Sequence, residues 1–222
     1  RDWSSDVCSS ELSKPFGERL FKQIQGFGEY GFPESHAASF ALLVYASGWL
    51  KTHHHAAFCA SLLNSQPMGF YSPASIVRDA QAHGVEVLPL RVTHSDWDCT
   101  LTEDRPPKVR LGLRLLQGLG ESTGRSIVGA RAEGPFTSLD DLLRRTALRK
   151  NVVEALAEGG ALEGLVQGRR LALWKARAPR AGALFGDEAL RAPEVRLPPL
   201  CPAEQQGLDY ERVGFSWNGL PM

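Results

Sequence analysis

Apolar residues recur every three or four positions near the start of the chain, which is the period of one helix face. Four of them predict a helix over residues 12–25 that Gly26 and Gly28 end. A second apolar stretch, residues 37–50, is interleaved with Ala and Gly and predicts a buried helix capped by Glu34 or Ser35. The N-terminal part of the chain is therefore expected to be helical.

Shorter segments, bounded by Gly and Pro, follow downstream. Helical spacing and strand-like runs alternate there. The combination predicts an α+β fold that is mainly α, with a helical segment, a small α/β unit and a further helical region. The further expected helices cover residues 56–63, 73–83, 139–144, 149–158 and 169–178, and the expected strands cover 85–90, 93–101 and 109–113.

Composition and pattern divide the chain into five regions. The first ten residues are rich in Ser and Asp and lack apolar periodicity, which is typical of a non-native leader. After Ala178 the chain turns rich in Pro and Gly, which predicts a linker. The expected regions are a leader at 1–11, helices at 12–66, a small α/β unit at 67–113, a helix-hairpin-helix region at 114–178, and a linker with the start of a truncated next domain at 179–222.

A formal net charge of zero hides a strong segregation of charge. Residues 1–104 carry 7 Lys/Arg and 12 Asp/Glu, a net −5, and residues 181–222 carry 3 and 6, a net −3. Residues 105–180 carry 15 and 7, a net +8. Because a basic block attracts polyanions, a nucleic acid partner is expected there.

The four cysteines are far apart and form no CxxC pair, so neither a zinc ribbon nor a disulfide scaffold is expected, and a reducing cytosol fits. The most apolar stretch, residues 37–50, is shorter than the roughly 20 residues that cross a bilayer. No signal-peptide pattern begins the chain. A cytoplasmic protein with no membrane partner is expected.

The string LLQGLGESTGRSIVGAR has the form of a helix-hairpin-helix motif. Gly118 and Gly120 allow a tight turn whose backbone N–H groups face one phosphate oxygen, and Leu119 packs the two helices together. Such a motif binds the nucleic acid backbone without reading bases. Arg125 and Arg131 favour this interpretation over the alternative, in which the glycines only end one helix before the next begins.

A second, degenerate hairpin is expected at residues 148–165, where Gly159 and Gly160 separate two helices. Positive charge beside it favours DNA contact over a merely solvated helix face. The residues that carry this charge are Arg144, Arg145, Arg149 and Lys150.

Two clusters suggest a metal site and are better explained otherwise. Asp96 and Asp98 would share a face on a strand, but no third carboxylate stands near them in a motif, so a solvated strand face is expected. His53, His54 and His55 would point about 100° apart on a helix and could not chelate one ion, so a solvated helix end is expected. No metal ligand is predicted in this chain.

Four large side chains raise a choice between binding and packing. Trp97, Trp174 and Trp217 are expected to anchor the core or an interdomain contact rather than to stack on bases. His36 lies in the first turn of an apolar helix, where free N–H groups favour an anion such as a triphosphate. The alternative for His36 is a buried structural histidine.

The segment FGEYGFPESHAASFALLVYASGWLKTHHHAAFCASLLNSQPMGFYSPASIVRDAQAHGVEV closely resembles the error-prone branch of the bacterial C-family DNA polymerases, which are of the DNA polymerase III alpha-subunit type. The resemblance continues through HSDWDC, LGLRLLQGLG, PFTSLDDL and EALAEGGALEGL and covers about residues 12–210. NSQPMGFYSP and HSDWDC favour the error-prone over the replicative branch. Two departures are His55, where the family usually has Pro, and the tail WNGLPM, a poor match to the expected continuation.

The resemblance implies that residues 12–66 belong to the fingers, which receive the incoming nucleotide. Ser35, His36 and Lys51 are then candidate nucleotide-binding residues. The helix-hairpin-helix region is implied to hold duplex DNA, while the two Mg²⁺ ions bind to palm aspartates upstream of this chain, which supplies no catalytic residue. The candidate DNA-binding residues are Gly118, Leu119, Gly120, Arg125, Arg131, Arg149 and Lys150.

The expected function is part of template-directed nucleotidyl transfer in DNA replication and repair, including translesion synthesis. The implied partners are primed template DNA and dNTPs, with a sliding clamp and other translesion proteins as further candidates. One alternative is a stand-alone, non-catalytic DNA-binding module, and another is an RNA-processing factor that shares the hairpin. The chain by itself is expected to be inactive as a polymerase.

Overall fold

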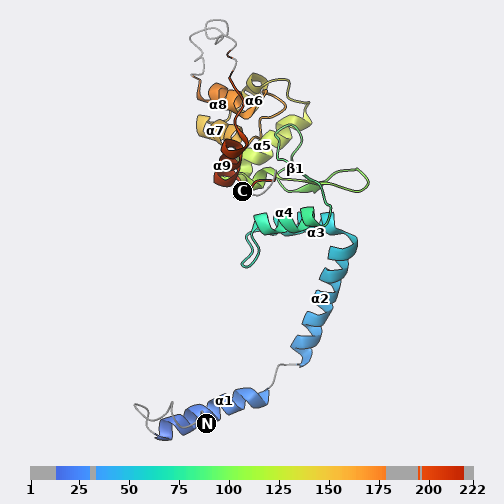
Figure 1. Ribbon diagram of the computed structural model, residues 1–222, viewed down its shortest axis with the longest axis vertical. Coiled ribbons are helices and arrows are strands. Elements are labelled where there is room, and N and C mark those ends of the chain that lie inside the picture. The colour runs from blue at the N-terminus through green and yellow to red at the C-terminus, as the bar shows by residue number, and fades with distance from the viewer. Residues whose placement is uncertain (1–13, 31–33, 179–194, 196, 218–222) are drawn as a thin grey trace. The chain divides into compact units, whose positions relative to one another are not determined.

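A computed structural model describes residues 14–30, 34–178, 195 and 197–217. The described residues form nine α-helices, one short 3-10 helix and one three-stranded sheet (Figure 1), which confirms the predicted α+β, mainly α class. The chain divides into two compact units, Arg1–Trp49 and Leu50–Met222. The expected leader at 1–11 lies outside the described residues, as do residues 179–194, 196 and 218–222 of the expected linker and next domain at 179–222.

The first unit contains α1 (Lys14–Tyr30) and most of α2 (Glu34–His53). The predicted helix end at Gly26 is wrong, because α1 continues through it. A glycine inside a helix costs only about 1 kcal/mol and does not stop it without further stop signals.

The expected burial of residues 37–50 is also wrong, because their side chains are exposed. Burial requires a facing apolar layer. Within the first unit, only α1 and α2 are described, and Phe16, Leu20 and Phe21 of α1 are themselves exposed. The large exposed side chains of α2 are Phe40, Leu42, Leu43, Val44, Tyr45, Trp49 and Leu50.

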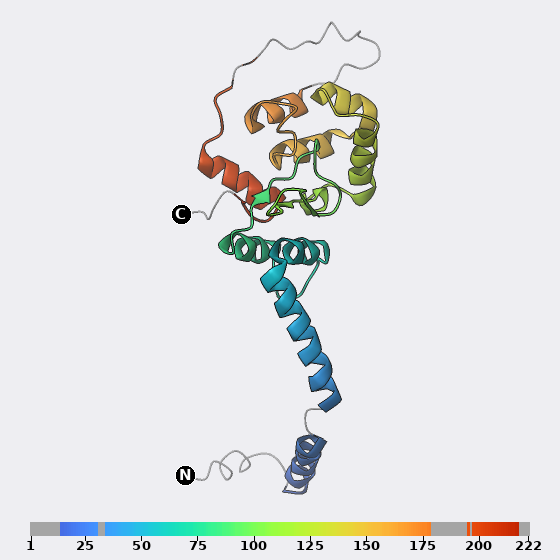
Figure 2. The same cartoon turned by 90° about the vertical axis from the view of Figure 1, so that its right-hand side faces the viewer.

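The second unit begins with α3 (His55–Asn64) and α4 (Pro73–Ala82), which lie side by side (Figure 2). The Ser72 hydroxyl accepts a hydrogen bond from the Ser75 N–H and caps α4, which Pro73 begins. Gly84 follows the helix with φ of 79°. The predicted helix over residues 73–83 is confirmed to within one residue, while its Ser72 cap was not predicted.

The sheet is small and consists of β1 (Val87–Leu88), β2 (Thr100–Leu101) and β3 (Val109–Arg110) in the order β1-β3-β2. β1 pairs with β3 in parallel, and β2 pairs with β3 in antiparallel orientation. The pairs in register are Val87 with Val109, Leu88 with Arg110, Thr100 with Arg110, and Leu101 with Val109.

The predicted strand over 93–101 is wrong for residues 93–99, which form a turn and a loop. The Ser95 hydroxyl accepts a hydrogen bond from the Arg91 N–H, and the Ser95 N–H donates to the Arg91 carbonyl, which closes the turn. The Asn64 side chain then holds the Cys99 backbone through both of its polar groups. The Ser95 and Cys99 backbone groups therefore bind partners outside any strand.

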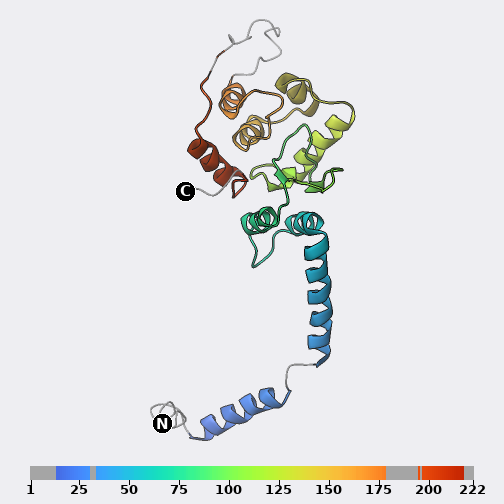
Figure 3. The ribbon, with the colours of Figure 1, turned by 45° about the vertical axis from the view of Figure 1, so that its right-hand side comes forward.

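The rest of the second unit is helical, and its apolar side chains continue the core that begins at α3. α7 and α8 pack against each other, and α9 packs against α7 (Figure 3). The elements are η1 (Leu113–Leu115), α5 (Glu121–Ala132), α6 (Leu139–Thr146), α7 (Lys150–Glu158), α8 (Arg169–Arg177) and α9 (Pro202–Arg212).

Helix α9 differs from the expected start of a new domain, because it lies within the second unit. The Asp209 carboxylate on α9 accepts a hydrogen bond at 2.8 Å from the Arg169 guanidinium on α8, and both side chains are buried. A buried ion pair of this kind fixes α9 against the core. The other expected domain boundaries stay predictions.

The described cysteines, Cys59, Cys99 and Cys201, are free thiols. None of the helices in the described ranges combines the length and the apolar character that crossing a bilayer requires.

Candidate nucleic acid interface

The turn between η1 and α5 has the shape that the sequence predicted for a hairpin. Gly118 adopts φ of +89°, a conformation that strains any residue with a Cβ. The Arg212 carbonyl accepts a hydrogen bond from the Gln117 N–H at 2.8 Å, and Leu119 is buried. The hairpin therefore rests on α9 at one end and on the core at the other.

Gly120 has a different role from Gly118. Its φ of −76° and ψ of 152° suit any residue, so the prediction that the turn itself needs both glycines is wrong for Gly120. It is the N-cap of α5 and makes no side-chain capping bond, and a Cβ there would meet no atom within 4 Å. Open space therefore lies beside the first N–H groups of α5, which lack intrahelical acceptors and carry the positive end of the helix dipole.

The helix behind the hairpin is held by close packing. A Cβ on Gly124 would lie 2.4 Å from the Trp97 ring, so only glycine allows the ring to approach. Trp97 and Trp217 pack against the core, as predicted, whereas the prediction is wrong for Trp174, whose side chain is 53% exposed. Trp174 lies on the outer face of α8.

Several arginines of the basic block donate hydrogen bonds to the protein's own backbone, among them Arg131 and Arg145. Arg131 donates to the Val92 carbonyl at 3.0 Å and to the Ser95 carbonyl at 2.6 Å, and it also pairs with Asp96. Arg145 donates to the Ala130 carbonyl in the last turn of α5 and to the Gly134 carbonyl in the loop after it, and its guanidinium lies 4.8 Å from the centroid of the Phe136 ring. These guanidinium groups hold loops in place, so we leave Arg131 out of the proposed DNA-binding set.

The net charge of +8 over residues 105–180 overstates the positive charge at this surface. Several of its cations pair with acidic residues from outside residues 105–180, which lowers the excess that reaches solvent. Those pairs are Lys108 with Glu86, Arg114 with Asp98, Arg131 with Asp96, Arg169 with Asp209, and Arg170 with Glu204.

Three of the predicted DNA-binding cations remain on the surface. Arg125 is 63% exposed and pairs with Glu121 one turn away on α5. Arg149 and Lys150 are exposed at the start of α7, and no ion pair of either is found in the part of the chain that the structure describes. Exposed cations without a protein partner are available to phosphate.

The degenerate second hairpin differs from its prediction. Gly159 and Gly160 do end α7, but the next helix begins only at Arg169, beyond the expected range 148–165. A Cβ on Gly160 would lie 2.5 Å from the Arg169 guanidinium. A side chain of the protein itself therefore fills the space beside this turn.

Asp96 and Asp98 lie in a loop, so their prediction as a solvated strand face is wrong. Asp96 pairs with Arg131 on α5, and the Asp98 carboxylate lies 2.8 Å from the Arg114 guanidinium. Two different arginines thus neutralise the two carboxylates separately, which does not suit a shared divalent ion.

Comparison with known proteins places this hairpin in a known context. Residues 84–172 match the family described as "Helix-hairpin-helix motif". Error-prone DNA polymerases of Alkalilimnicola ehrlichii and Burkholderia pseudomallei are each 50% identical over 93% and 95% of this chain. The chain belongs to the error-prone DNA polymerase family.

A further relative, error-prone DNA polymerase 1 of Agrobacterium fabrum, is 48% identical over 97% of the chain. The chain spans 20% of the first two relatives and 22% of the third, about a fifth of an error-prone polymerase. The predicted resemblance, the error-prone branch and the helix-hairpin-helix motif are confirmed.

The three residues that were predicted to bind the incoming nucleotide belong to different compact units. Ser35 and His36 lie in the first turn of α2, in the first unit, and their side chains lie outside the described part of the structure. Lys51 lies in the second unit, where its ammonium group is 3.0 Å from the Asp79 carboxylate. Their joint role at one nucleotide stays a prediction.

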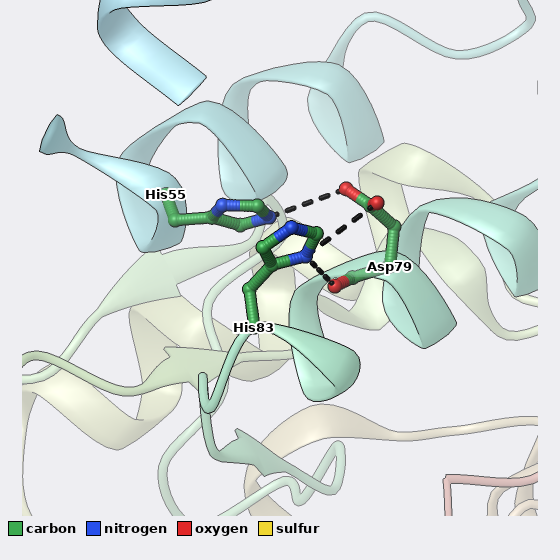
Figure 4. A group of neighbouring side chains, drawn as sticks. All are labelled: His55, Asp79 and His83. Atoms are coloured by element: carbon green, nitrogen blue, oxygen red, sulfur yellow. Dashed lines mark hydrogen bonds and ion pairs between the residues drawn. The ribbon is translucent and has the colours of Figure 1, made fainter. Parts of the chain in front are cut away.

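A cluster that sequence reasoning missed surrounds Asp79 (Figure 4). His55 Nε2 lies 3.2 Å from one carboxylate oxygen of Asp79, and His83 Nδ1 lies 3.6 Å from the other. The His55 side chain is only 14% exposed, so the predicted solvated helix end is wrong for this residue. Asp79 and His83, four residues apart on α4, share one helix face, and that spacing was the available signal.

The Asp79 carboxylate is the negative centre of this cluster. The hydrogen bond from the Lys51 ammonium contributes most to lowering its pKa, with smaller contributions from the charges of Lys51 and His83 and the hydrogen bond from His55. Lys51, His55 and Asp79 line a cavity of about 390 Å³ whose other walls are largely apolar. Burial raises the pKa of the Cys59 thiol, which also lines this cavity, to about 12.

Proposed function

We propose that this chain forms the part of an error-prone DNA polymerase that binds the DNA backbone beside the active site. The observation that carries the proposal is the open N-terminus of α5 next to Gly120, within a matched helix-hairpin-helix motif. Unpaired N–H groups in a tight turn form a site for one phosphate oxygen. A turn that reads no base suits an enzyme that must move along any sequence.

The electrostatic part of this binding comes from exposed cations. Arg125 lies on the same helix as the hairpin, and Arg149 and Lys150 begin α7, whose Ala155 lies 3.7 Å from where a Cβ on Gly118 would be. Neutralised phosphates release counterions, so affinity falls as salt rises. We assign DNA contact to these three cations together with Gly118, Leu119 and Gly120.

The whole reaction proposed is template-directed nucleotidyl transfer onto primed DNA, with dNTPs as substrates, in replication, repair and translesion synthesis. We also propose a sliding clamp and other translesion proteins as partners, and the cytoplasm as the location. The transfer uses two Mg²⁺ ions held by clustered carboxylates. The described residues do not fit that pair of ions, because Asp96 and Asp98 are each paired with an arginine. We propose that the carboxylates of the active site lie outside this chain.

The purified chain is therefore expected not to extend a primed template with dNTPs and Mg²⁺. Primer extension followed on a denaturing gel is the measurement, with a complete error-prone polymerase as positive control. Extension by the chain that disappears in the Asp96→Asn, Asp98→Asn double variant would place catalysis in the loop between β1 and β2.

For the nucleotide, we propose that Ser35 and His36 contact the triphosphate at the start of α2, with Lys51 as a further contact to phosphate or DNA. In a complete polymerase that carries this segment, His36→Gln is expected to raise the KM for dNTP or slow incorporation, with the melting temperature nearly unchanged. Affinity for primed DNA should be retained, because the hairpin is a separate element. If His36 is a packed core residue instead, a loss of about 1–2 kcal/mol should lower the melting temperature by several degrees without a dNTP effect.

A further inference from the structure

The cluster at His55, Asp79 and His83 brings three metal-binding groups together from two helices. His55 begins α3, Asp79 lies in the second turn of α4, and His83 is the C-cap residue of α4. Figure 4 shows both imidazole rings turned toward the Asp79 carboxylate. One ligand atom from each of the three side chains lies within 4.8 Å of the other two.

The chemistry of the three groups selects the ion. Two imidazole nitrogens and one carboxylate oxygen suit Zn²⁺ and its first-row neighbours, whereas Mg²⁺ and Ca²⁺ prefer oxygen alone. The distances of 3.2 and 3.6 Å between the histidine nitrogens and the Asp79 oxygens are close to the edge of a tetrahedron around an ion with bonds of about 2.0–2.2 Å. The two rings are stacked, with centroids 4.3 Å apart and planes 25° apart, so one imidazole must turn before both nitrogens can point at the same ion.

A metal ion that binds to this cluster must replace a proton and compete with a neighbouring ammonium group. His83 Nδ1 lies 2.7 Å from the Asp79 backbone carbonyl, so a proton on that nitrogen gives way to the ion. The Lys51 ammonium lies 3.0 Å from both Asp79 oxygens and competes with a cation. Three protein ligands leave a fourth position for water, and the cavity lined by His55 and Asp79 provides the space for it.

We propose that His55, Asp79 and His83 form a binding site for a transition metal ion of the Zn²⁺ class. The site is separate from the DNA-binding hairpin and does not depend on its function. An ion there joins the start of α3 to the end of α4 and fixes the two helices relative to each other. His55 completes the site, since the two ligands on α4 alone form a weaker pair.

The test is titration of the metal-free chain with Co²⁺ and Zn²⁺. Co²⁺ bound by these ligands is expected to give the visible absorption of a tetrahedral site, and Zn²⁺ should displace it at one equivalent and raise the melting temperature. His55→Gln and His83→Gln are each expected to weaken Zn²⁺ binding about tenfold or more. His94→Gln is the matched control, because it removes an exposed histidine outside the cluster. This variant has as many histidines as the His55 and His83 variants.

Lys51→Met distinguishes this site from general histidine binding. Because it removes the ammonium that competes for Asp79, it is expected to tighten Zn²⁺ binding several-fold. Circular dichroism of each metal-free variant checks that it is folded. The proposal is overturned if the chain shows no tetrahedral Co²⁺ absorption, or if the His55, His83 and His94 variants bind Zn²⁺ equally, which would make the cluster an ordinary ion-pair network.

Discussion

Arg169→Met is expected to destabilise the second unit by about 3–5 kcal/mol, because it leaves a buried carboxylate without its partner. The Arg169 and Asp209 side chains are only 6% and 1% exposed. Arg169 also donates to the Gln205 carbonyl at 3.0 Å, and the Ser216 hydroxyl donates to the second Asp209 oxygen at 2.8 Å. The pair therefore joins α8, α9 and the segment after α9.

Urea denaturation followed by circular dichroism measures this effect. Arg170→Met is the matched control, since the adjacent Arg170 pairs with Glu204 at the surface and its loss is expected to change stability far less. A double variant, Arg169→Met with Asp209→Leu, is expected to recover much of the stability, because no buried charge remains. Equal, small losses in the Arg169 and Arg170 single variants would show that α9 is not fixed by the buried pair.

The second large effect is expected at the hairpin, where the two glycines separate folding from binding. Gly118→Val forces a β-branched residue into φ of +89°. We expect it to lower the free energy of unfolding by about 1–3 kcal/mol and also to weaken DNA binding. Gly120→Val meets no neighbouring atom and keeps an ordinary φ, so the fold should be retained. Its side chain would occupy the space beside the N–H groups of α5 and is expected to weaken DNA binding about tenfold, equal to about 1.4 kcal/mol.

Gly129→Val on the same helix is the matched control for Gly120→Val. Gly129 is exposed, and a Cβ there meets no atom within 4 Å. Fluorescence anisotropy with a labelled duplex compares the affinities, and thermal melting compares the stabilities. Normal DNA binding by Gly120→Val would assign the affinity to the surrounding Arg and Lys residues alone.

The helices were the most predictable part of this fold, because their ends carry local signals. Ser72, Pro73 and Gly84 mark both ends of α4, and the predicted range 73–83 differs from the structure by one residue. In α1 the local signal was misleading, because Gly26 and Gly28 weaken the helix without ending it. Burial of α2 could not be read from its apolar composition, since burial depends on what faces the helix.

Contacts between distant residues were beyond the reach of sequence patterns. The loop at 93–99 alternates like a strand, but Asn64 and Arg131, more than thirty residues away on either side, bind its backbone instead. The cluster at Asp79 could not be predicted for the same reason, because His55 lies 24 residues before Asp79 in the sequence. By contrast, the hairpin at Gly118 was predictable, since its turn and its apolar packing lie within one short string.

The most direct test of the central claim is the salt dependence of DNA binding by the purified chain. The affinity for duplexes of several unrelated sequences is measured over a range of salt concentrations, for the wild type and for Gly120→Val. We expect equal affinities for all sequences, a linear fall of the logarithm of affinity with the logarithm of salt, and a slope smaller by about 1 in the variant, since one phosphate contact is lost. Affinity that depends on sequence, or a slope that Gly120→Val leaves unchanged, would contradict a hairpin that binds the DNA backbone.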